Sequence, residues 1–278
     1  MTKKSKIDAI ILSTTFGENV GDIISFLKKI CLNCLNVKRH YNVFPVFVFE
    51  KSEIKKYDTV LSYFENYQSA IKPILLKNNK GTGFSSCLNF GIFKTNSKWI
   101  LRIDTDDELE GDRIINQLGI MKKEDLDISY GYMKDQKGEI LKYPRNKFSL
   151  LTDLSFGLNP IAHPTVCIKR ESLFLRYNEN QNRCEDFELW INLFIKEGIK
   201  SKCITYPLTL YNTRRSYEKD SDNAKTQIKI RLKYGFRLLL ISISLFSGIF
   251  NNLLRLLFGN NILLKLRRKL NRANPFKI

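Results

Sequence analysis

Four carboxylates lie within five positions of the chain, directly after a short apolar run. The run is "WILRI" (99–103), and the acids are Asp104, Asp106, Asp107 and Glu108. Carboxylates this close repel one another, so a cation is needed to hold them ionised together unless water solvates them well or their pKa values rise. Mg²⁺ and Mn²⁺ take oxygen ligands, usually one or two carboxylates completed by water and phosphate oxygens, which suits a nucleoside diphosphate. Acids here are also suited to start a turn and to cap a following helix, which is the structural alternative.

A second acidic pair opens an amphipathic segment further along. In "CEDFELWINLFIKEG" (184–198), Glu185 and Asp186 precede apolar residues spaced for one face of a helix. A helix N-terminus keeps such acids ionised, and a carboxylate within reach of a hydroxyl can take its proton. A helix cap is the alternative role for Asp186. Since the only histidines are His40 and His163, a Ser-His-Asp triad or a multi-histidine metal site has few possible arrangements.

Short apolar runs that end in polar residues must position these acids. Strands are predicted at "KIDAIILSTT", "VFPVFVFE", "KPILLKNN" and "WILRI", with helical faces at 20–34 and 84–92. "DISYGYM" and "SKCITYPLTLYNT" predict further strands, and "NPIAHPTVCIKRESL" a loop and a strand. Such alternation predicts an α/β fold with a mostly parallel sheet and helices on both faces, where ligands bind beyond the carboxyl ends of the strands. The first acidic cluster would then lie where a ligand is expected.

Composition places the chain among ordinary globular proteins. Its 278 residues are 43% hydrophobic and 27% charged, enough for one substantial core. The six cysteines are scattered, which predicts reduced, buried thiols, and the one C-x-x-C, Cys31 and Cys34, is expected on the core face of a helix. The first residues have no secretory pattern, so a cytoplasmic location is expected.

The net charge of +18 is concentrated at the C-terminal end. Twelve Lys and Arg residues and no acid follow Asp222, so we divide the chain into a main domain, 1–222, and a basic amphipathic helical tail, 223–278. The apolar stretch 236–258 is interrupted by polar residues and arginines, so a helix in the membrane interface fits better than a spanning one. This predicts peripheral attachment to anionic lipid on the inner face of the cell membrane. The alternatives are that the tail packs on the main domain, binds a partner helix or spans the bilayer. Nucleic acid is not an expected partner, because the basic residues of the tail are interleaved with Leu, Ile and Phe.

Three motifs in matching order give the chain a family resemblance. "NNKGTGFSSCLNFGIFKTNSKWILRIDTDDELEGDRIINQ" (78–117) resembles the nucleotide-sugar segment of family 2 glycosyltransferases with the GT-A (Rossmann-like) fold. "NPIAHPTVCIKRESL" resembles the H-P-[ST]-V stretch of that family, and "CEDFELW" its E-D-x-x-L-W helix. The resemblance spans residues 7–215 and points to the amylovoran-biosynthesis-like branch, bacterial enzymes that build surface polysaccharides (capsule, exopolysaccharide or O-antigen). It implies inverting transfer of a sugar from a nucleoside diphosphate, UDP being expected, to a hydroxyl of a glycan or polyprenyl-linked acceptor.

The resemblance also assigns roles to the acids. Asp104 would meet the ribose or the metal, and Asp106 the metal, Mg²⁺ or Mn²⁺, and the diphosphate. His163 would complete the metal site or make a structural hydrogen bond, which are alternatives. Asp186, with Glu185 beside it, would be the catalytic base.

Nucleotide contacts are expected at strand ends, in the glycine-bearing turn and on the helix behind it. They are Thr14, Thr15, Glu50, Lys80, Gly81 and Asn89. Family members usually carry an Asp after the second strand, where this chain has "FEKSE", so Glu50 would replace the base-reading Asp. Because of this departure, an alternative function remains: the protein could be a catalytically silent sugar-nucleotide binder or a scaffold of a membrane glycan assembly complex. Nucleotidyl transfer to a sugar phosphate ranks lower, because it leaves "EDFELW" without a role.

Overall fold

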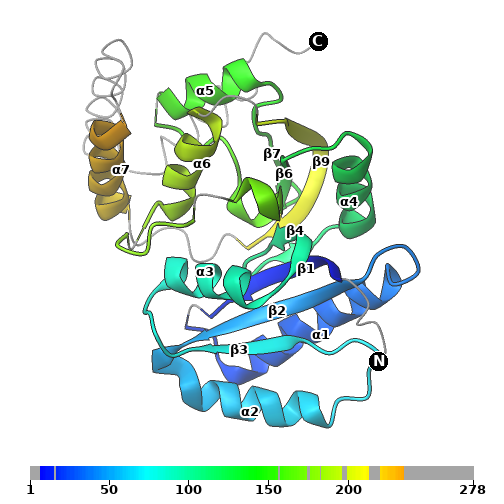
Figure 1. Cartoon of the computed structure of the whole chain (residues 1–278). Helices are drawn as coiled ribbons and strands as arrows, with labels where there is room; N and C mark the ends of the chain where they lie inside the picture. The colour runs from blue at the N-terminus through cyan, green and yellow to red at the C-terminus, as the bar shows by residue number, and fades with distance from the viewer. Residues whose placement is uncertain are drawn as a thin grey trace.

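A mixed sheet with nine strands forms the centre of the part of the chain that the computed structural model describes, residues 7–15, 17–155, 157–173, 176–181, 183–195, 199–212 and 220–234 (Figure 1). Across the sheet the strands are β3 (Ile74–Asn78), β2 (Val43–Glu50), β1 (Ile7–Thr14), β4 (Ser97–Arg102), β8 (Cys167–Lys169), β6 (Ile128–Asp135), β9 (Ser201–Tyr211) and β5 (Glu108–Leu109), with β7 (Ile140–Leu141) paired to β6.

Strand direction confirms the predicted mostly parallel α/β sheet. β3, β2, β1 and β4 pair in parallel, and β6 pairs in parallel with β9. The antiparallel strands β8, β5 and β7 have only two or three residues each. The carboxyl ends of β1 to β4 therefore meet at one edge, which is the usual ligand edge of an open α/β sheet.

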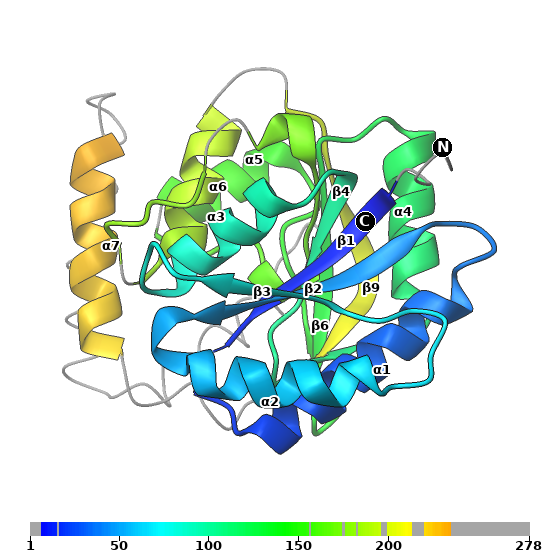
Figure 2. The same cartoon turned by 60° about the horizontal axis from the view of Figure 1, so that its bottom comes forward.

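Helices cover both faces of the sheet, and each face has its own hydrophobic core (Figures 1 and 2). One face carries α1 (Val20–Asn36), α2 (Ile54–Glu65) and α4 (Arg113–Lys123); the other carries α3 (Phe84–Lys94), α5 (Lys147–Ser155) and α6 (Glu185–Ile195). Successive side chains of a strand point to opposite faces, so Ile11 joins the first core and Leu12 the second.

The helix α2 is a departure from the predicted order, which passes from the second strand to the third without a helix. Only Val60 and Phe64 of α2 are buried, so the segment "IKKYDTVLSYFE" carries a weak apolar stripe. The prediction for the C-x-x-C is confirmed, because Cys31 and Cys34 are buried on α1 and all six cysteines are free thiols.

The last described helix, α7 (Asp220–Tyr234), lies beside α6 (Figure 1). The predicted boundary at residue 222 falls inside this helix. The apolar stretch 236–258 and the basic residues after it, on which the membrane prediction depends, lie outside the described residues. Within the described stretches, none of the helices has both the length and the apolar character needed to cross a membrane.

Candidate active site

The acidic loop, residues 104–108, follows β4 at the ligand edge. Its first acid, Asp104, forms an ion pair with the guanidinium of Arg102, whose side chain is 2% exposed while that of Asp104 is 33% exposed. Arg102 also donates to the carbonyl of Leu12 on β1 at 3.2 Å. The buried guanidinium of Arg102 is thus held by the neighbouring strand β1, and it pairs with a carboxylate, Asp104, that is still partly exposed to solvent.

The loop is a turn but does not cap a helix, so the structural alternative is half right. The backbone N–H of Asp107 donates to the carbonyl of Asp104 at 3.2 Å, which closes the turn. Glu108 then enters the short strand β5, and α4 begins only at Arg113 with Asp112 in the N-cap position. Helix capping therefore does not account for the acids of the loop.

Asp107 supports the loop from inside. Its Oδ1 accepts from the backbone N–H of Asn212, which follows β9, at 3.1 Å, and its buried Oδ2 has no hydrogen-bond partner among the described groups. Burial first, and then the Asp104 carboxylate, raises the pKa of Asp107 to about 8. A second hydrogen bond connects the acidic loop with the loop after β1: Glu18 Oε1 accepts from the hydroxyl of Thr105 at 2.7 Å.

Arg113, which we did not single out from the sequence, connects the end of β4, just before the acidic loop, with other parts of the fold. Its NH2 donates to the carbonyl of Arg102 at 2.9 Å, and its NH1 donates to Pro164 O at 2.7 Å and to Thr209 Oγ1 at 2.9 Å. Burial lowers the pKa of Arg113 to about 10 without removing its charge at neutral pH. The signal was present in the sequence, because an arginine falls on the same helical face as the apolar residues Ile114, Leu118 and Met121.

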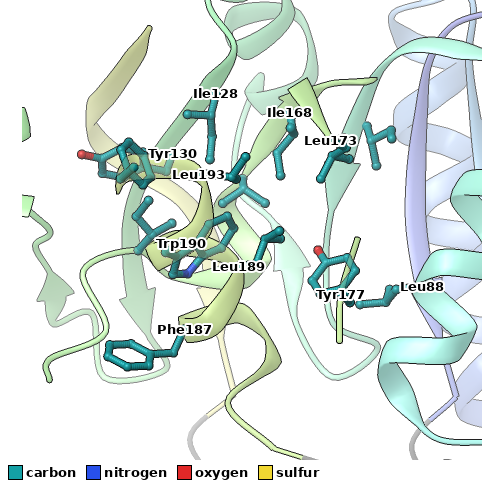
Figure 3. Packing of buried hydrophobic residues seen from close by; sticks show 14 of the residues in the cluster. Leu88, Ile128, Tyr130, Ile168, Leu173, Tyr177, Phe187, Leu189, Trp190 and Leu193 are labelled. Carbon is teal, nitrogen blue, oxygen red and sulfur yellow. The ribbon is translucent and has the colours of Figure 1, made fainter. Parts of the chain in front are cut away.

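Glu185 and Asp186 lie at the start of α6, and the apolar face of this helix is well packed. Trp190, Leu193 and other apolar residues of α6 pack towards Ile128 and Ile168 of β6 and β8, which fixes the helix on the sheet (Figure 3). Sequence periodicity correctly predicted this buried face.

Asp186 is held on both oxygens. Its Oδ2 accepts from Asn159 Nδ2 at 2.5 Å, and its Oδ1 accepts from the backbone N–H of Phe187 at 2.7 Å. Burial is the main reason that the pKa of Asp186 is raised and that the pKa of Glu185 is raised to about 8. The Asp104 carboxylate contributes to both shifts, so the acidic loop and the start of α6 act on one another electrostatically. Packed side chains also connect the two regions: the Phe84 ring lies 5.0 Å from the Arg102 guanidinium and 6.1 Å from the His163 ring, which lies 6.0 Å from Trp190 of α6.

His163 is part of a buried ring cluster. Its Nε2 lies 2.8 Å from the hydroxyl of Tyr177, and its ring meets Phe84 and Trp190 at 6.1 and 6.0 Å between centroids. Burial, and then the charge of Arg102, lowers the pKa of His163 well below its ordinary value, so the imidazole is neutral. The structural hydrogen bond is thus present, and metal ligation by His163 stays a prediction.

The predicted nucleotide contacts occupy three neighbouring strand ends. Thr14 is the last residue of β1 and Thr15 follows it. Glu50 is the last residue of β2, and its backbone N–H donates to Thr15 Oγ1 at 3.4 Å. The Glu50 carboxylate accepts from the backbone N–H of Gly83 at 2.8 Å and so fixes the loop that follows β3. The hydroxyl of Thr14 donates to the carbonyl of Val48 at 2.8 Å, so its hydrogen already has an acceptor within the protein.

The turn after β3 is wound around Asn78. Asn78 Oδ1 accepts from the backbone N–H groups of Lys80 and Gly81 at 3.3 and 3.2 Å. A Cβ on Gly81 would lie 1.9 Å from Ser86 Oγ, so the turn needs glycine to pack on α3. Lys80 and Gly81 also line a pocket that this turn forms with α3 and the segment 176–179.

Asn89 has a structural role that the sequence did not reveal. Its Oδ1 accepts from the N–H of Tyr177 at 3.1 Å, and its Nδ2 donates to the carbonyl of the same residue at 2.9 Å and to Glu179 Oε1 at 2.8 Å. The amide therefore holds the segment that leads to α6 against α3. A nucleotide contact by Asn89 stays a prediction.

The chemistry of the donor set fits a hard divalent cation. Among the described residues, no group of three or more His, Cys, Asp and Glu side chains is arranged to hold a metal ion. Mg²⁺ does not need such a cage, because it is usually bound through one or two carboxylates, with water and substrate phosphate filling the other positions. Asp104 and Asp106, both partly exposed at the end of β4, can supply those carboxylates.

Comparison with known proteins decides the family. Residues 31–191 match the model of the family described as glycosyl transferase family 2. The chain belongs to glycosyltransferase family 2. A protein of Haemophilus influenzae (strain ATCC 51907 / DSM 11121 / KW20 / Rd), named as an uncharacterized glycosyltransferase, is 25% identical to it over 265 residues, 92% of this chain and 93% of that protein.

Solved structures show the same fold. TarS residues 1–349 from S. aureus, in complex with UDP-GlcNAc, superposes on this glycosyltransferase with a TM-score of 0.59 and 16% identity, covering 82% of this chain and 66% of that one. The same TarS fragment in a second crystal structure gives a TM-score of 0.60 and 14% identity, over 87% and 71% of the two chains. The longer TarS structure is covered only to 39%. This glycosyltransferase therefore spans about two thirds of the TarS fragment, and the likeness establishes the GT-A fold.

Proposed function

We propose that this glycosyltransferase transfers a sugar, with inversion, from a nucleoside diphosphate, preferably UDP, to a hydroxyl of a glycan or polyprenyl-linked acceptor in bacterial surface-polysaccharide synthesis. The observation that carries the proposal is the arrangement of two acids: Asp104 is paired with the buried Arg102 at the end of β4, and Asp186 is held by Asn159 and the backbone N–H of Phe187 at the start of α6. We assign the first carboxylate to the donor and the second to proton transfer.

In this proposal the strand ends bind the donor. Asp104 and Asp106 would hold Mg²⁺ or Mn²⁺, which would supply positive charge next to the diphosphate. Thr15, Glu50 and the turn at Lys80 and Gly81 surround the nucleoside. Arg102 keeps Asp104 in place, because its guanidinium is paired with that carboxylate and is itself buried.

In this proposal the group that accepts the proton, Asp186, lies at the start of α6. The acceptor oxygen forms a bond to the anomeric carbon as the bond from that carbon to the diphosphate oxygen breaks, and the hydroxyl proton passes to Asp186. Asn159 holds the accepting carboxylate by one oxygen, which orients it. The raised pKa of Asp186 makes it a stronger base than an exposed aspartate once it is ionised.

Calorimetric titration with UDP, GDP, CDP and dTDP, with and without Mn²⁺, tests the donor half. We expect metal-dependent binding of one diphosphate, and loss of that binding in Asp106→Ala. Asp112→Ala is a matched control, because Asp112 is exposed and makes no side-chain capping bond. Binding without turnover of the matching nucleotide sugar would favour the silent binder or scaffold, and no binding at all would contradict the proposal.

We also propose attachment to the cytoplasmic face of the membrane through the basic segment that follows α7. Support comes from the positive charge after Tyr234 and its interleaving with apolar residues. Flotation with anionic vesicles should separate the full chain from a chain that ends at residue 234. A cut at residue 222 is unsuitable because it removes most of α7. Equal flotation of the two chains would contradict the proposal.

A further inference from the structure

Glu188 is a buried carboxylate on α6, one turn after Glu185. It is 2% exposed, and ionised groups that are this well buried need donors around them. Its Oε1 accepts from Lys233 Nζ at 2.8 Å and from Tyr234 Oη at 2.7 Å, and its Oε2 accepts from Asn178 Nδ2 at 2.9 Å. Burial raises the pKa of Glu188, but these three hydrogen bonds outweigh it and lower the pKa, so the side chain carries its charge.

The partners on one side of Glu188 come from the last turn of α7. Tyr234 Oη also accepts from Asn192 Nδ2 at 3.1 Å, one turn further along α6. The side chains of Glu188 and Asn192 therefore meet one tyrosine hydroxyl. Two adjacent turns of α6 are fixed to the same end of α7.

α7 also packs near the loop that orients the proposed base. The guanidinium carbon of Arg231 lies 6.0 Å from the centre of the Phe187 ring. A Cβ on Gly157 would lie 1.2 Å from Arg231 NH2, and the φ of Gly157 is +69°, so glycine is what allows the loop to pass under α7. Two residues later, Asn159 donates to Asp186. The helix α7 thus contacts both Phe187, next to the base, and the loop that holds the base.

On the other side, Glu188 is connected to the donor half. Asn178, its partner, follows Tyr177, whose backbone is held by Asn89 of α3 and whose hydroxyl meets His163. The carboxylate of Glu188 is therefore the point at which α7, α6 and the segment 176–181 meet.

We propose that Glu188 is a positioning residue, and that α7 belongs to the catalytic unit because it holds the start of α6 in place relative to the acidic loop. The inference rests on the proposed role of Asp186. This proposal gives α7 and the basic segment after Tyr234 different roles: α7 supports the reaction, and the basic segment attaches the protein to the membrane.

The test compares Glu188→Gln and Tyr234→Phe in the full chain, using UDP with Mn²⁺ for binding and UDP-GlcNAc for turnover. Glutamine keeps the size of the side chain but turns one acceptor into a donor facing Lys233 or Asn178. We expect kcat to fall by about 10- to 100-fold, since an acid displaced by about 1 Å loses its alignment, while the Kd for UDP stays within about twofold. Tyr234→Phe, which removes only a hydroxyl, should shift kcat in the same direction.

Glu171→Gln is the matched control, since the Glu171 side chain is 84% exposed and its pairing with Lys169 lies outside this network. Unchanged kcat in both test variants, or an equal loss of UDP binding and turnover, would overturn the positioning role. Hydrogen exchange over residues 185–189 gives a readout that does not need activity, because exchange there should rise in both variants while β1 and β2 stay protected. If the wild-type chain binds none of the four nucleoside diphosphates, the proposed function fails, and the exchange measurement still decides whether α7 holds α6.

Discussion

Replacing Arg113 with lysine tests whether one guanidinium holds the acidic loop in place. Arg113 is 1% exposed and donates five hydrogen bonds through its three nitrogens. A lysine ammonium offers three donors on a single atom, so at least two acceptors lose their donor. Pro164 O keeps a second donor in the Thr209 hydroxyl at 3.1 Å, so the loss falls mainly on Gln117 Oε1 and the carbonyl of Arg102.

The magnitude follows from those two orphaned acceptors. Each buried polar group left unpaired costs about 1–3 kcal/mol, so Arg113→Lys should lower the free energy of unfolding by about 4 kcal/mol. At about 2–4 °C per kcal/mol for a chain of this size, the melting temperature should fall by about 8–16 °C. Because the carbonyl of Arg102 directly precedes the acidic loop, metal-dependent binding of UDP should weaken as well.

Thermal and urea unfolding, read by circular dichroism, provide the measurement. Arg145→Lys is the control, since Arg145 is exposed and its side chain donates to Tyr132 Oη at 2.8 Å, so this replacement should leave the unfolding transition nearly unchanged. If Arg113→Lys unfolds at the same urea concentration as the control and binds UDP normally, the buried guanidinium does not hold the loop and the reasoning is refuted.

Three further predictions concern the acids. Asp106→Ala should abolish the Mn²⁺-dependent part of UDP binding in calorimetry, and wild-type affinity would remove Asp106 from the metal site. Asp186→Asn should keep that affinity but lower turnover by about 10²- to 10⁴-fold, because an amide cannot take the proton; normal turnover would exclude Asp186 as the base. Burial raises the pKa of Glu185 to about 8 and raises that of Asp186, so the accepting carboxylate gains charge as pH rises. The rate of transfer should therefore climb with pH above the range in which an exposed aspartate titrates, and a profile flat from about pH 5 upward would contradict the raised pKa of Asp186.

Much of the fold could be predicted because its signals are local. Apolar runs marked the strands β1 to β4, and spacing of three and four residues marked the faces of α1, α3 and α6. The helix α2 and the two-residue strands β5 and β7 gave almost no such signal. The order of strands beyond β4 could not be obtained, since β8 pairs with both β4 and β6 although more than 30 residues separate each partner in the chain.

For the site, residue types were easier to predict than their partners. The acids at 104–107 and 185–186 could be found because each group is contiguous in sequence. Their supports are distant: Arg113 reaches Pro164 across 51 residues, and Asn159 reaches Asp186 across 27. Glu188 was hidden for a different reason, because a glutamate on an amphipathic helix is usually solvated, and only the docking of α7 buries it.

The bond from Tyr234 to Glu188 has a consequence for the order in which the protein matures. The strands β1 to β4 are complete by residue 102, so the edge that we expect to bind the nucleotide can fold while the rest of the chain is still being synthesised. The start of α6 cannot be fixed so early, because its partner on α7 lies 46 residues later in the chain. We therefore expect ribosome-bound chains stalled before residue 234 to retain UDP without turning over its sugars. Competence for transfer would then be acquired only after the nucleotide edge has formed, when α7 packs against the start of α6.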